Sequence, residues 1–232
     1  MKTIVQIIGI ISSPHRNGFS ATLTRKALNA AKKEGANIEE IYLPDFDIQY
    51  CRGCLRCVSG DKCALNDDLN TLRNKLEKVE GIIISSPTYG LNPNALMMNF
   101  IQRIGIYAVY RSSLAKKYIV GISTAGAIGQ KKVAKFLTNI TDGLFKVGYR
   151  TGVLGAKVGD GSLNPRDIKK AESLGKKLVK DIKIQKKYRF QKLWIKFLSA
   201  VAIKPTMRKN LRENKTSSMQ GAYNYLLKMR EI

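Results

Sequence analysis

No apolar run in the sequence is long enough to cross a bilayer, which takes about 18 residues in succession. The two longest candidates are Ile4–Ile11, which Gln6 and Gly9 interrupt, and Leu198–Ile203. Ile4–Ile11 could pass for the core of a secretory signal, but no small-residue cleavage site follows it. We therefore expect a cytoplasmic protein without a membrane span. Apolar residues still make up 44% of the chain, so we expect a folded core rather than a disordered chain.

Acidic residues are scarce: 17 Asp and Glu stand against 41 Lys and Arg, for a net charge of +24. Residues 183–232 hold 13 basic and 2 acidic residues and so contribute +11. Such an excess favours an acidic protein, a phosphorylated cofactor, nucleic acid or an anionic membrane as partner, without choosing among them. A solvated basic surface is the simpler explanation of the charge alone. No recognised nucleic-acid-binding module is present, so we do not expect a nucleic-acid partner.

Cysteine is also scarce, and its four copies fall within thirteen residues, at Cys51, Cys54, Cys57 and Cys63. A secreted disulfide-stabilised fold spreads its bridges along the chain, so this clustering indicates a reducing compartment and a local metal site. Three thiols at steps of three, with a fourth on the same loop, can converge on one iron–sulfur cubane. Zinc bound by the four thiolates, and thiols that are free or disulfide-bonded, are the alternatives.

Short apolar runs alternate with helical patterns up to residue 184. Strands are predicted at Thr3–Ile11, Ile38–Leu43, Gly81–Ser85, Tyr118–Ser123 and Tyr149–Val158. Helices are predicted at Ser20–Glu34, Asp67–Lys78, Asn94–Tyr110, Lys131–Phe145 and Pro165–Ile184. Five such repeats predict an α/β fold with a five-stranded parallel sheet and helices on both faces. Because ligands of such sheets bind beyond the carboxyl ends of the strands, the loops after the first, third and fourth strands are the candidate site.

The loop after the first strand has the composition of a phosphate site. Small hydroxyl residues and a glycine precede a helix N-terminus, where unpaired backbone N–H groups and the helix dipole favour an anion. The candidate ligands are Ser12, Ser13, Arg16, Asn17, Gly18, Phe19 and Ser20. Neither the dinucleotide fingerprint nor the ATP-binding one is present. An ordinary helix start is the alternative for this loop on its own.

The loops after the third and fourth strands are suited to a flat ligand. Pro87 stiffens the first of them, Tyr89 can cover a ring, and Gly90 allows close backbone approach. The candidate contacts are Pro87, Thr88, Tyr89 and Gly90, followed by Ser123, Thr124, Ala125 and Gly126 of the later loop. Together the three loops predict one phosphate pocket beside one flat pocket.

These three loops, on this strand pattern, resemble the NADPH-dependent FMN reductase branch of the flavodoxin-like superfamily. The matching runs are SSPHRNGFS at 12–20, SPTYG at 86–90, STAG at 123–126 and the helix segment Met97–Arg103. The resemblance implies a flavodoxin-like three-layer sandwich with strand order 2-1-3-4-5, and FMN with its phosphate on 13–20 and its ring on 87–90 and 123–126. His15, the only histidine, stands where the family commonly has arginine; we interpret it as a surface loop residue.

The cysteine loop, residues 51–63, is similar to that of the iron–sulfur flavoproteins within this branch, and the resemblance covers about residues 1–182. It implies a [4Fe–4S] cluster on the four cysteines and electron transfer between the cluster, FMN and an external partner, ferredoxin or NAD(P)H. We name no catalytic acid or base, because the cofactors carry the chemistry. A cluster-free NAD(P)H-dependent FMN or quinone reductase and a non-enzymatic flavin-based redox sensor or carrier are the alternatives.

Residues 185–232 are predicted to form a basic helical extension of a domain that spans 1–184. A stripe of apolar residues recurs there at helical spacing: Phe190, Leu193, Trp194, Phe197, Leu198 and Val201. We expect Pro205 to end this helix and Met219–Met229 to form a last one. The stripe must be covered by its own domain, by another subunit or by an anionic membrane surface. Resemblance to soluble oligomeric reductases favours a subunit contact in a homodimer or homotetramer.

Overall fold

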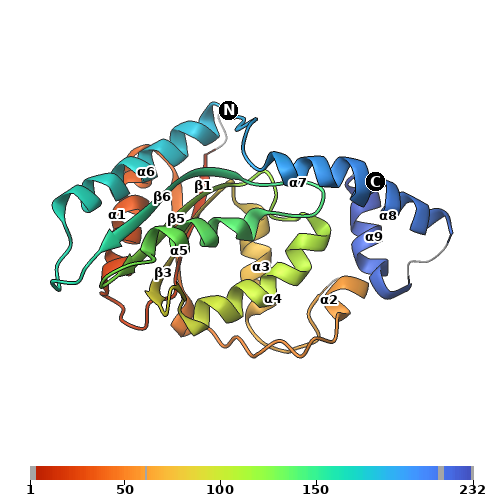
Figure 1. Cartoon of the computed structure of the whole chain (residues 1–232), viewed down its shortest axis with the longest axis horizontal. Helices are drawn as coiled ribbons and strands as arrows, with labels where there is room; N and C mark the ends of the chain where they lie inside the picture. Colours follow the sequence, from red (N-terminus) through yellow and green to blue (C-terminus); the bar gives the residue numbers. More distant parts are fainter. Residues whose placement is uncertain (1–3, 61, 214–216, 231–232) are drawn as a thin grey trace.

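The computed structural model describes residues 4–60, 62–213 and 217–230, and a parallel β-sheet lies at its centre (Figure 1). Its long strands are β1 (Gln6–Ile11), β2 (Asn37–Tyr42), β3 (Gly81–Tyr89), β5 (Tyr118–Ala125) and β6 (Tyr149–Lys157). They pair in parallel in the order β2-β1-β3-β5-β6, and the two-residue β4 (Asn92–Pro93) pairs antiparallel with the end of β3. Counted along the chain, the long strands have the order 2-1-3-4-5, which confirms the predicted sheet.

Helices cover both faces of this sheet. One face carries α1 (Phe19–Lys33) and α6 (Pro165–Lys183); the other carries α3 (Leu69–Lys78), α4 (Ala95–Arg111) and α5 (Gln130–Leu137). Side chains alternate between the faces, so Ile7 of β1 packs with α1 and α6, whereas Ile8 and Ile10 pack with the helices opposite. Burial on both faces explains why the strands read as continuous apolar runs in the sequence.

One helix is shorter than its pattern predicts. Instead of running over Lys131–Phe145, α5 ends at Leu137 and a 3-10 turn, Thr138–Thr141, follows. Thr138 Oγ1 donates to the carbonyl oxygen of Lys135 at 2.7 Å. Such hydroxyls compete with helical backbone bonds and favour a tighter turn. The other strands and helices predicted up to residue 184 are all present, although the predicted start of the first strand at Thr3 lies outside the described residues.

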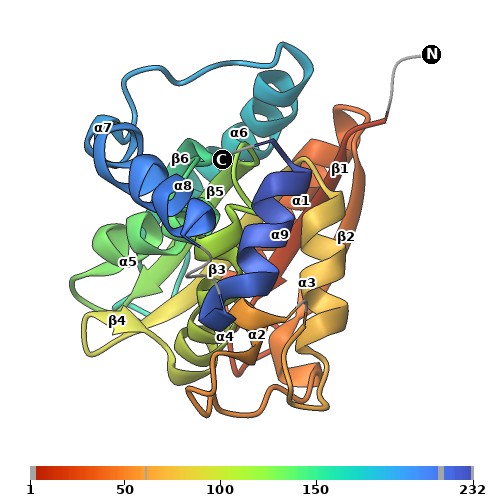
Figure 2. The same ribbon diagram turned by 90° about the vertical axis from the view of Figure 1, so that its right-hand side faces the viewer.

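The C-terminal extension packs onto the α/β domain; its residues 214–216 and 231–232 are outside the described part. It comprises α7 (Leu193–Leu198), a π turn (Ser199–Ile203), α8 (Lys204–Arg212), a 3-10 turn (Ser217–Met219) and α9 (Gln220–Lys228). The predicted last helix corresponds to α9, which lies beside α4 and the short α2 (Arg56–Ser59) of the cysteine loop (Figure 2). Met207, Tyr223 and Leu226 form a small core with Phe145 of the domain.

The prediction that Pro205 ends the amphipathic helix is wrong. Pro205 lies in the first turn of α8, directly after the π turn, and the helical backbone runs from Leu193 to Arg212. Proline lacks the N–H that an α-helix uses and its ring clashes with the preceding turn. A π turn locally rearranges the backbone hydrogen bonds, so the proline interrupts the regular helix without ending it. Within the described residues, no helix is both long and apolar enough to cross a membrane.

Candidate cofactor sites

The three predicted segments meet around one cavity of about 440 Å³ at the carboxyl ends of β1, β3 and β5. Two of them are not wholly loops as predicted: 87–89 are the last residues of β3, and 123–125 are the last residues of β5. Eleven of the predicted cofactor residues line it: Ser13, Asn17, Gly18, Phe19, Ser20, Pro87, Thr88, Tyr89, Thr124, Ala125 and Gly126. These residues come from three separate stretches of the chain, and the parallel sheet brings them together because its strands end at the same edge. Their role in holding a cofactor stays a prediction.

The first turn of α1 presents its backbone donors at this cavity. Gly18 is the N-cap residue, and within the described chain no side chain caps the helix and its first turn contains no acidic residue. The loop before it folds back on itself: Ser13 Oγ donates to the carbonyl oxygen of His15 at 2.9 Å and accepts from the His15 N–H at 3.2 Å. A Cβ atom at Gly18 would lie 2.7 Å from Ser13 Oγ. The tight turn therefore requires glycine, and it leaves N–H groups available to an anion.

Four predicted residues lie outside the lining of the cavity. The buried Ser12 and Ser123 use their hydroxyls inside the sheet: Ser12 Oγ lies 2.9 Å from Asn94 Oδ1, and Ser123 Oγ donates to the carbonyl oxygen of Ser86 at 2.7 Å. Arg16 turns away to pair with Asp45 at 2.5 Å and to stack over the Tyr42 ring. Gly90, with φ +54°, forms the turn beyond Tyr89. The hydroxyl-rich sequence thus serves partly to hold the loops.

Asn94 ties these loops together, and sequence reasoning missed it. Its side chain caps α4 by accepting from the Met97 N–H at 3.1 Å, and its Nδ2 donates to the carbonyl oxygen of Ser12 at 2.6 Å. Ser86 Oγ lies 3.2 Å from Asn94 Oδ1. The asparagine before a helical pattern was a readable cap signal, but its contact with a loop 82 positions away was not.

His15 and Val158 also line the cavity, although neither was among the predicted site residues. The signal for His15 was its position in the phosphate loop, where the resembling family commonly has a cation. His15, the only histidine, is exposed as expected of a surface loop residue, and it also borders the cavity. Val158 follows β6, and a single valine after a strand carries no signal of its own.

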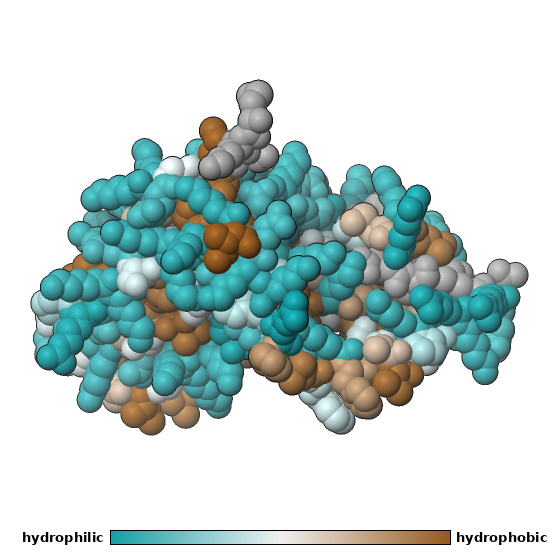
Figure 3. Space-filling view, turned by 90° about the horizontal axis from the view of Figure 1, so that it is seen from above, coloured by the Kyte–Doolittle hydropathy of each residue, from teal (hydrophilic) through white to brown (hydrophobic). Residues whose placement is uncertain are grey.

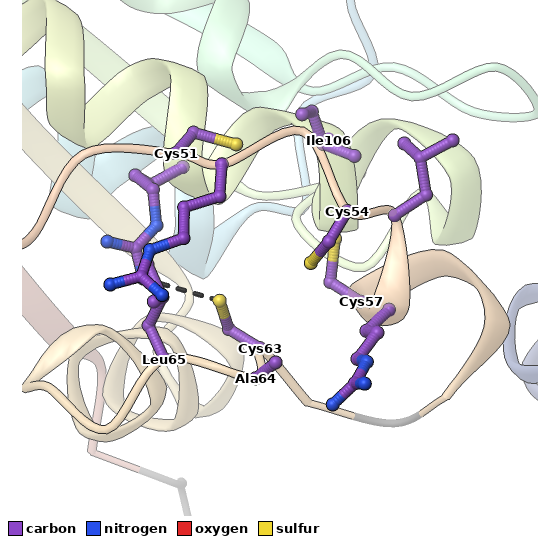
Figure 4. Close-up of a pocket in the computed structure, with 11 residues that line it drawn as sticks. Cys51, Cys54, Cys57, Cys63, Ala64, Leu65 and Ile106 are labelled. Carbon is purple, nitrogen blue, oxygen red and sulfur yellow. Dashed lines mark hydrogen bonds between the residues drawn. The ribbon is translucent and has the colours of Figure 1, made fainter.

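The four cysteines surround a second opening, of about 300 Å³, on the loop between β2 and α3 (Figure 4). All four are free thiols; Cys51 and Cys54 are exposed, and Cys57 and Cys63 are half-buried. Among the residues that the structure describes, no three His, Cys, Asp or Glu side chains come close enough to hold a single metal ion. The four thiols therefore share one opening.

Two left-handed residues shape the cysteine loop. Gly53 has φ +65° and Leu55 has φ +53°, on either side of Cys54. Only glycine adopts this region without cost, so Leu55 is held there by its surroundings. The turn lets the Gly53 N–H donate to Cys51 Sγ at 3.4 Å. The backbone is thus arranged so that a thiol accepts a hydrogen bond.

Arg103 of α4 has a buried side chain that reaches the cysteine opening. Its Nη2 donates to Cys63 Sγ at 3.3 Å, and its Nη1 donates to Asp67 Oδ2 at 2.7 Å and to the carbonyl oxygen of Gln49. The Arg103 and Asp67 side chains are 1% and 0% exposed. A buried guanidinium needs such partners, and Asp67 holds this one against the thiol. The residue stands in the segment Met97–Arg103 that carries part of the resemblance.

Arg111, eight positions further along α4, holds the other end of the loop. It donates to the carbonyl oxygens of Cys57, at 2.6 Å, and Gly60. Burial raises the pKa of the Cys57 thiol, negative charge on Cys63 raises it further, and Arg111 lowers it. Four thiolates at this opening would repel one another, so the deprotonated loop favours bound cations. Gly221 of α9 packs against Gly60 and Arg111, where a Cβ would collide with the backbone.

Known proteins resemble this chain in sequence and in fold. The sequence profile of the NADPH-dependent FMN reductase family matches residues 5–154. An iron–sulfur flavoprotein of Archaeoglobus fulgidus is 31% identical over 192 residues, which are 81% of this chain and 84% of the relative. One from Methanocaldococcus jannaschii is 31% identical over 196 residues, 79% of this chain and 100% of the relative. The structure of a flavone reductase has a TM-score of 0.63 and 19% identity, and the match covers 81% of this chain and 66% of that one.

Fold and matched relatives define a flavin-dependent oxidoreductase of the flavodoxin-like class. The chain belongs to the NADPH-dependent FMN reductase family and, within it, groups with the iron–sulfur flavoproteins.

Proposed function

We propose that this chain holds FMN in the three-loop cavity and a [4Fe–4S] cluster on Cys51, Cys54, Cys57 and Cys63, and passes electrons between them and an external carrier. The observation that supports the proposal most is the single opening lined by all four thiols, in which Arg103 donates to Cys63 Sγ. The relatives that match over most of the chain are named iron–sulfur flavoproteins, which agrees with the proposal.

The three-loop cavity has the donors that FMN requires. The first-turn N–H groups of α1 suit a phosphate. Around the rest of the cavity, Tyr89 offers an aromatic face and Ala125 and Gly126 offer backbone with little side chain. A Cβ atom at Gly126 would meet nothing within 4 Å, so this part of the loop is open toward a flat ligand.

The cysteine loop fits a multi-iron cluster better than one zinc ion. Within the described chain, no three of the thiols are grouped as a single ion requires, yet all four line one opening. A cluster of four irons keeps its thiolate ligands farther apart than a single tetrahedral ion does. The buried guanidinium groups of Arg103 and Arg111 supply positive charge beside this opening. Positive charge and hydrogen bonds to sulfur stabilise an anionic cluster and raise its reduction potential.

FMN accepts or donates one or two electrons and an iron–sulfur cluster one at a time, so together they couple a two-electron donor to one-electron carriers. The chain's part is positional, and α4 serves both sites: Asn94 at its start holds the cavity loops, and Arg103 and Arg111 hold the cysteine loop. The net charge of +24 favours an acidic electron carrier such as a ferredoxin. NAD(P)H is the alternative donor.

Anaerobic purification followed by flavin and iron quantification tests the proposal. We expect FMN rather than FAD, at about one per chain, and about four irons per chain, as a cubane requires. Cys54→Ser should lose most of the iron and keep its FMN, because the two sites use different loops. Ala64→Ser, on the same opening without a thiol, is the matched control and should keep both. Full iron in Cys54→Ser, or FAD in the wild type, contradicts the proposal.

The exposure of Cys51 and Cys54 favours a second candidate, a cluster-free NAD(P)H-dependent FMN or quinone reductase. The variant with all four cysteines replaced by serine separates the two. If the wild type contains no iron after anaerobic reconstitution and the variant keeps full NAD(P)H oxidation, the second candidate is correct. A homodimer or homotetramer, expected from the resemblance, stays a prediction that sedimentation of the FMN-loaded protein tests.

A further inference from the structure

The apolar stripe of the C-terminal extension faces solvent in the folded chain. Phe190 is 88% exposed, Trp194 72% and Phe197 59%; Leu193, Leu198 and Val201 are exposed as well. Figure 3 shows apolar side chains gathered along the edge where Figure 1 places α7, with hydrophilic ones around them. The stripe is therefore not buried against its own domain, which was one of the three contacts considered from the sequence.

The polar side of the same helix is the side that packs on the domain. Lys192 pairs with Asp142 and is only 6% exposed, and Lys196 Nζ donates to the carbonyl oxygen of Arg189 at 3.0 Å. Ser199 is buried, and its hydroxyl donates to the carbonyl oxygen of Phe145 at 3.4 Å. An ordinary surface helix turns its apolar side inward. Met207 of α8 packs inward, but the α7 part of the helix is fixed with its apolar stripe outward. The outward stripe indicates a contact with something else.

The surroundings of the stripe are strongly basic. Residues 182–212 contain ten Lys and Arg and no Asp or Glu. One helical turn beyond Val201, Lys204 lies near Lys146, which also neighbours Lys116; the three come from different segments of the chain. Burial and these two ammonium groups lower the pKa of Lys146 to about 8. Lysines from three segments of the chain thus gather at this end of the stripe, where they favour an anionic partner.

Two partners remain that could bury the stripe: another copy of the chain and a lipid surface. A two-fold contact would place this basic segment against itself, because such an interface uses the same surface on both subunits. Like charges facing each other disfavour that pairing. A bilayer with anionic headgroups matches both properties, since its interface accepts aromatic and aliphatic side chains and its phosphates attract the lysines. The charge around the stripe thus favours a lipid surface over the subunit contact expected from the resemblance.

We propose that residues 190–212 dock this protein onto an anionic membrane surface, with the stripe at the boundary between headgroups and acyl chains and Lys116, Lys146 and Lys204 beside the phosphates. The helix lies along the surface and does not span it. Its twenty residues from Leu193 to Arg212 extend about 30 Å, at 1.5 Å each. The proposal does not depend on either cofactor.

Trp194 is the only tryptophan of the chain, so its fluorescence reports directly on the stripe. The full chain is mixed with vesicles of phosphatidylcholine alone or with phosphatidylglycerol, at physiological salt. With the anionic vesicles we expect a blue shift of Trp194 emission and co-sedimentation of the protein, both reversed by high salt. With the neutral vesicles we expect neither. Equal binding to both vesicles, or an unchanged Trp194 emission, overturns the proposal.

Phe197→Asp keeps the tryptophan and should weaken vesicle binding more than about tenfold, because it replaces one large apolar contact with a charge. Ile4→Asp, at an exposed apolar residue outside the stripe, is the matched control and should bind as the wild type does. Since Phe197 is exposed, FMN content and circular dichroism should be unchanged. If Phe197→Asp instead sediments as a smaller oligomer in the absence of lipid, the stripe is a subunit contact and the membrane proposal is wrong.

Discussion

Arg103→Met removes the cation that pairs with Asp67 and keeps an apolar side chain of similar length. Because both side chains of the pair are at most 1% exposed, the substitution leaves a buried carboxylate without its guanidinium. Removing one partner of such a pair costs about 3–5 kcal/mol, which is a large part of the roughly 5–15 kcal/mol that stabilises a typical fold. We therefore expect the free energy of unfolding to fall by about that amount.

Urea unfolding of the cofactor-free chain, followed by circular dichroism, measures this change. Lys75→Met is the matched control: Lys75 pairs with Glu39 at 2.5 Å, but the two side chains are 40% and 45% exposed. An exposed pair contributes about 1 kcal/mol or less. Adding Asp67→Asn to Arg103→Met should recover part of the loss, because the buried negative charge is then gone.

The pH dependence gives an independent check of the same pair. Burial tends to raise the pKa of Asp67, but hydrogen bonds from Arg103 and from the Leu69 and Gln49 backbone hold it below its ordinary value. A carboxylate with a lower pKa in the folded state stabilises the fold above its unfolded-state pKa of about 4, and this stabilisation is lost as the pH falls through the folded-state value. The gap between wild type and Arg103→Met should therefore narrow below about pH 4. If Arg103→Met lowers the free energy of unfolding no more than Lys75→Met does at pH 7, the buried pair stabilises the fold no more than the exposed one.

The two cavity glycines should respond differently to valine. Gly18→Val should weaken FMN binding and also destabilise the apo fold, because its Cβ would collide with Ser13 Oγ. Gly126→Val should weaken FMN binding more than about tenfold and leave the apo fold intact, because its Cβ would meet no other atom within 4 Å. Flavin titration with thermal unfolding measures both, and unchanged affinity in both variants would mean that the cavity is not the flavin site. Burial, aided by Tyr149 and Asp181, raises the pKa of Tyr118 to about 12. The fold should therefore lose stability as the pH rises from about 10, the ordinary tyrosine pKa, toward 12, and Tyr118→Phe should lessen that loss; an identical alkaline transition in the variant would contradict the assignment.

The sheet and its loops could be predicted because they depend on local, repetitive signals. The strands could be located because they are apolar runs buried on both faces of the sheet. Right-handed crossovers between consecutive strands then limited the possible strand orders. The loops at one edge of the sheet followed from that topology. Which hydroxyls face the cavity did not follow, because Ser12 and Ser123 are used by Asn94 and Ser86, residues at distant positions.

The cysteine loop and the extension show what the sequence could not predict. The spacing of the four cysteines indicated a shared site, but the buried hydrogen bond from Arg103 to Cys63 joins positions 40 residues apart. The stripe on α7 was visible in the sequence, whereas its outward direction depends on the pairing of Lys192 with Asp142. Pro205 was wrongly predicted to end the amphipathic helix, because the effect of the proline depends on the π turn before it. In each case the deciding contact is between segments, and no local pattern encodes it.

We propose that one chain holds a flavin and a cluster that exchange electrons with each other. An anaerobic titration with dithionite, followed by visible absorption and electron paramagnetic resonance, counts the electrons that each group takes up. We expect uptake of about three electrons per chain, two at FMN and one at the cluster, and about two in Cys54→Ser. Uptake of about two electrons by the iron-reconstituted wild type, with no signal from a reduced cluster, would contradict it.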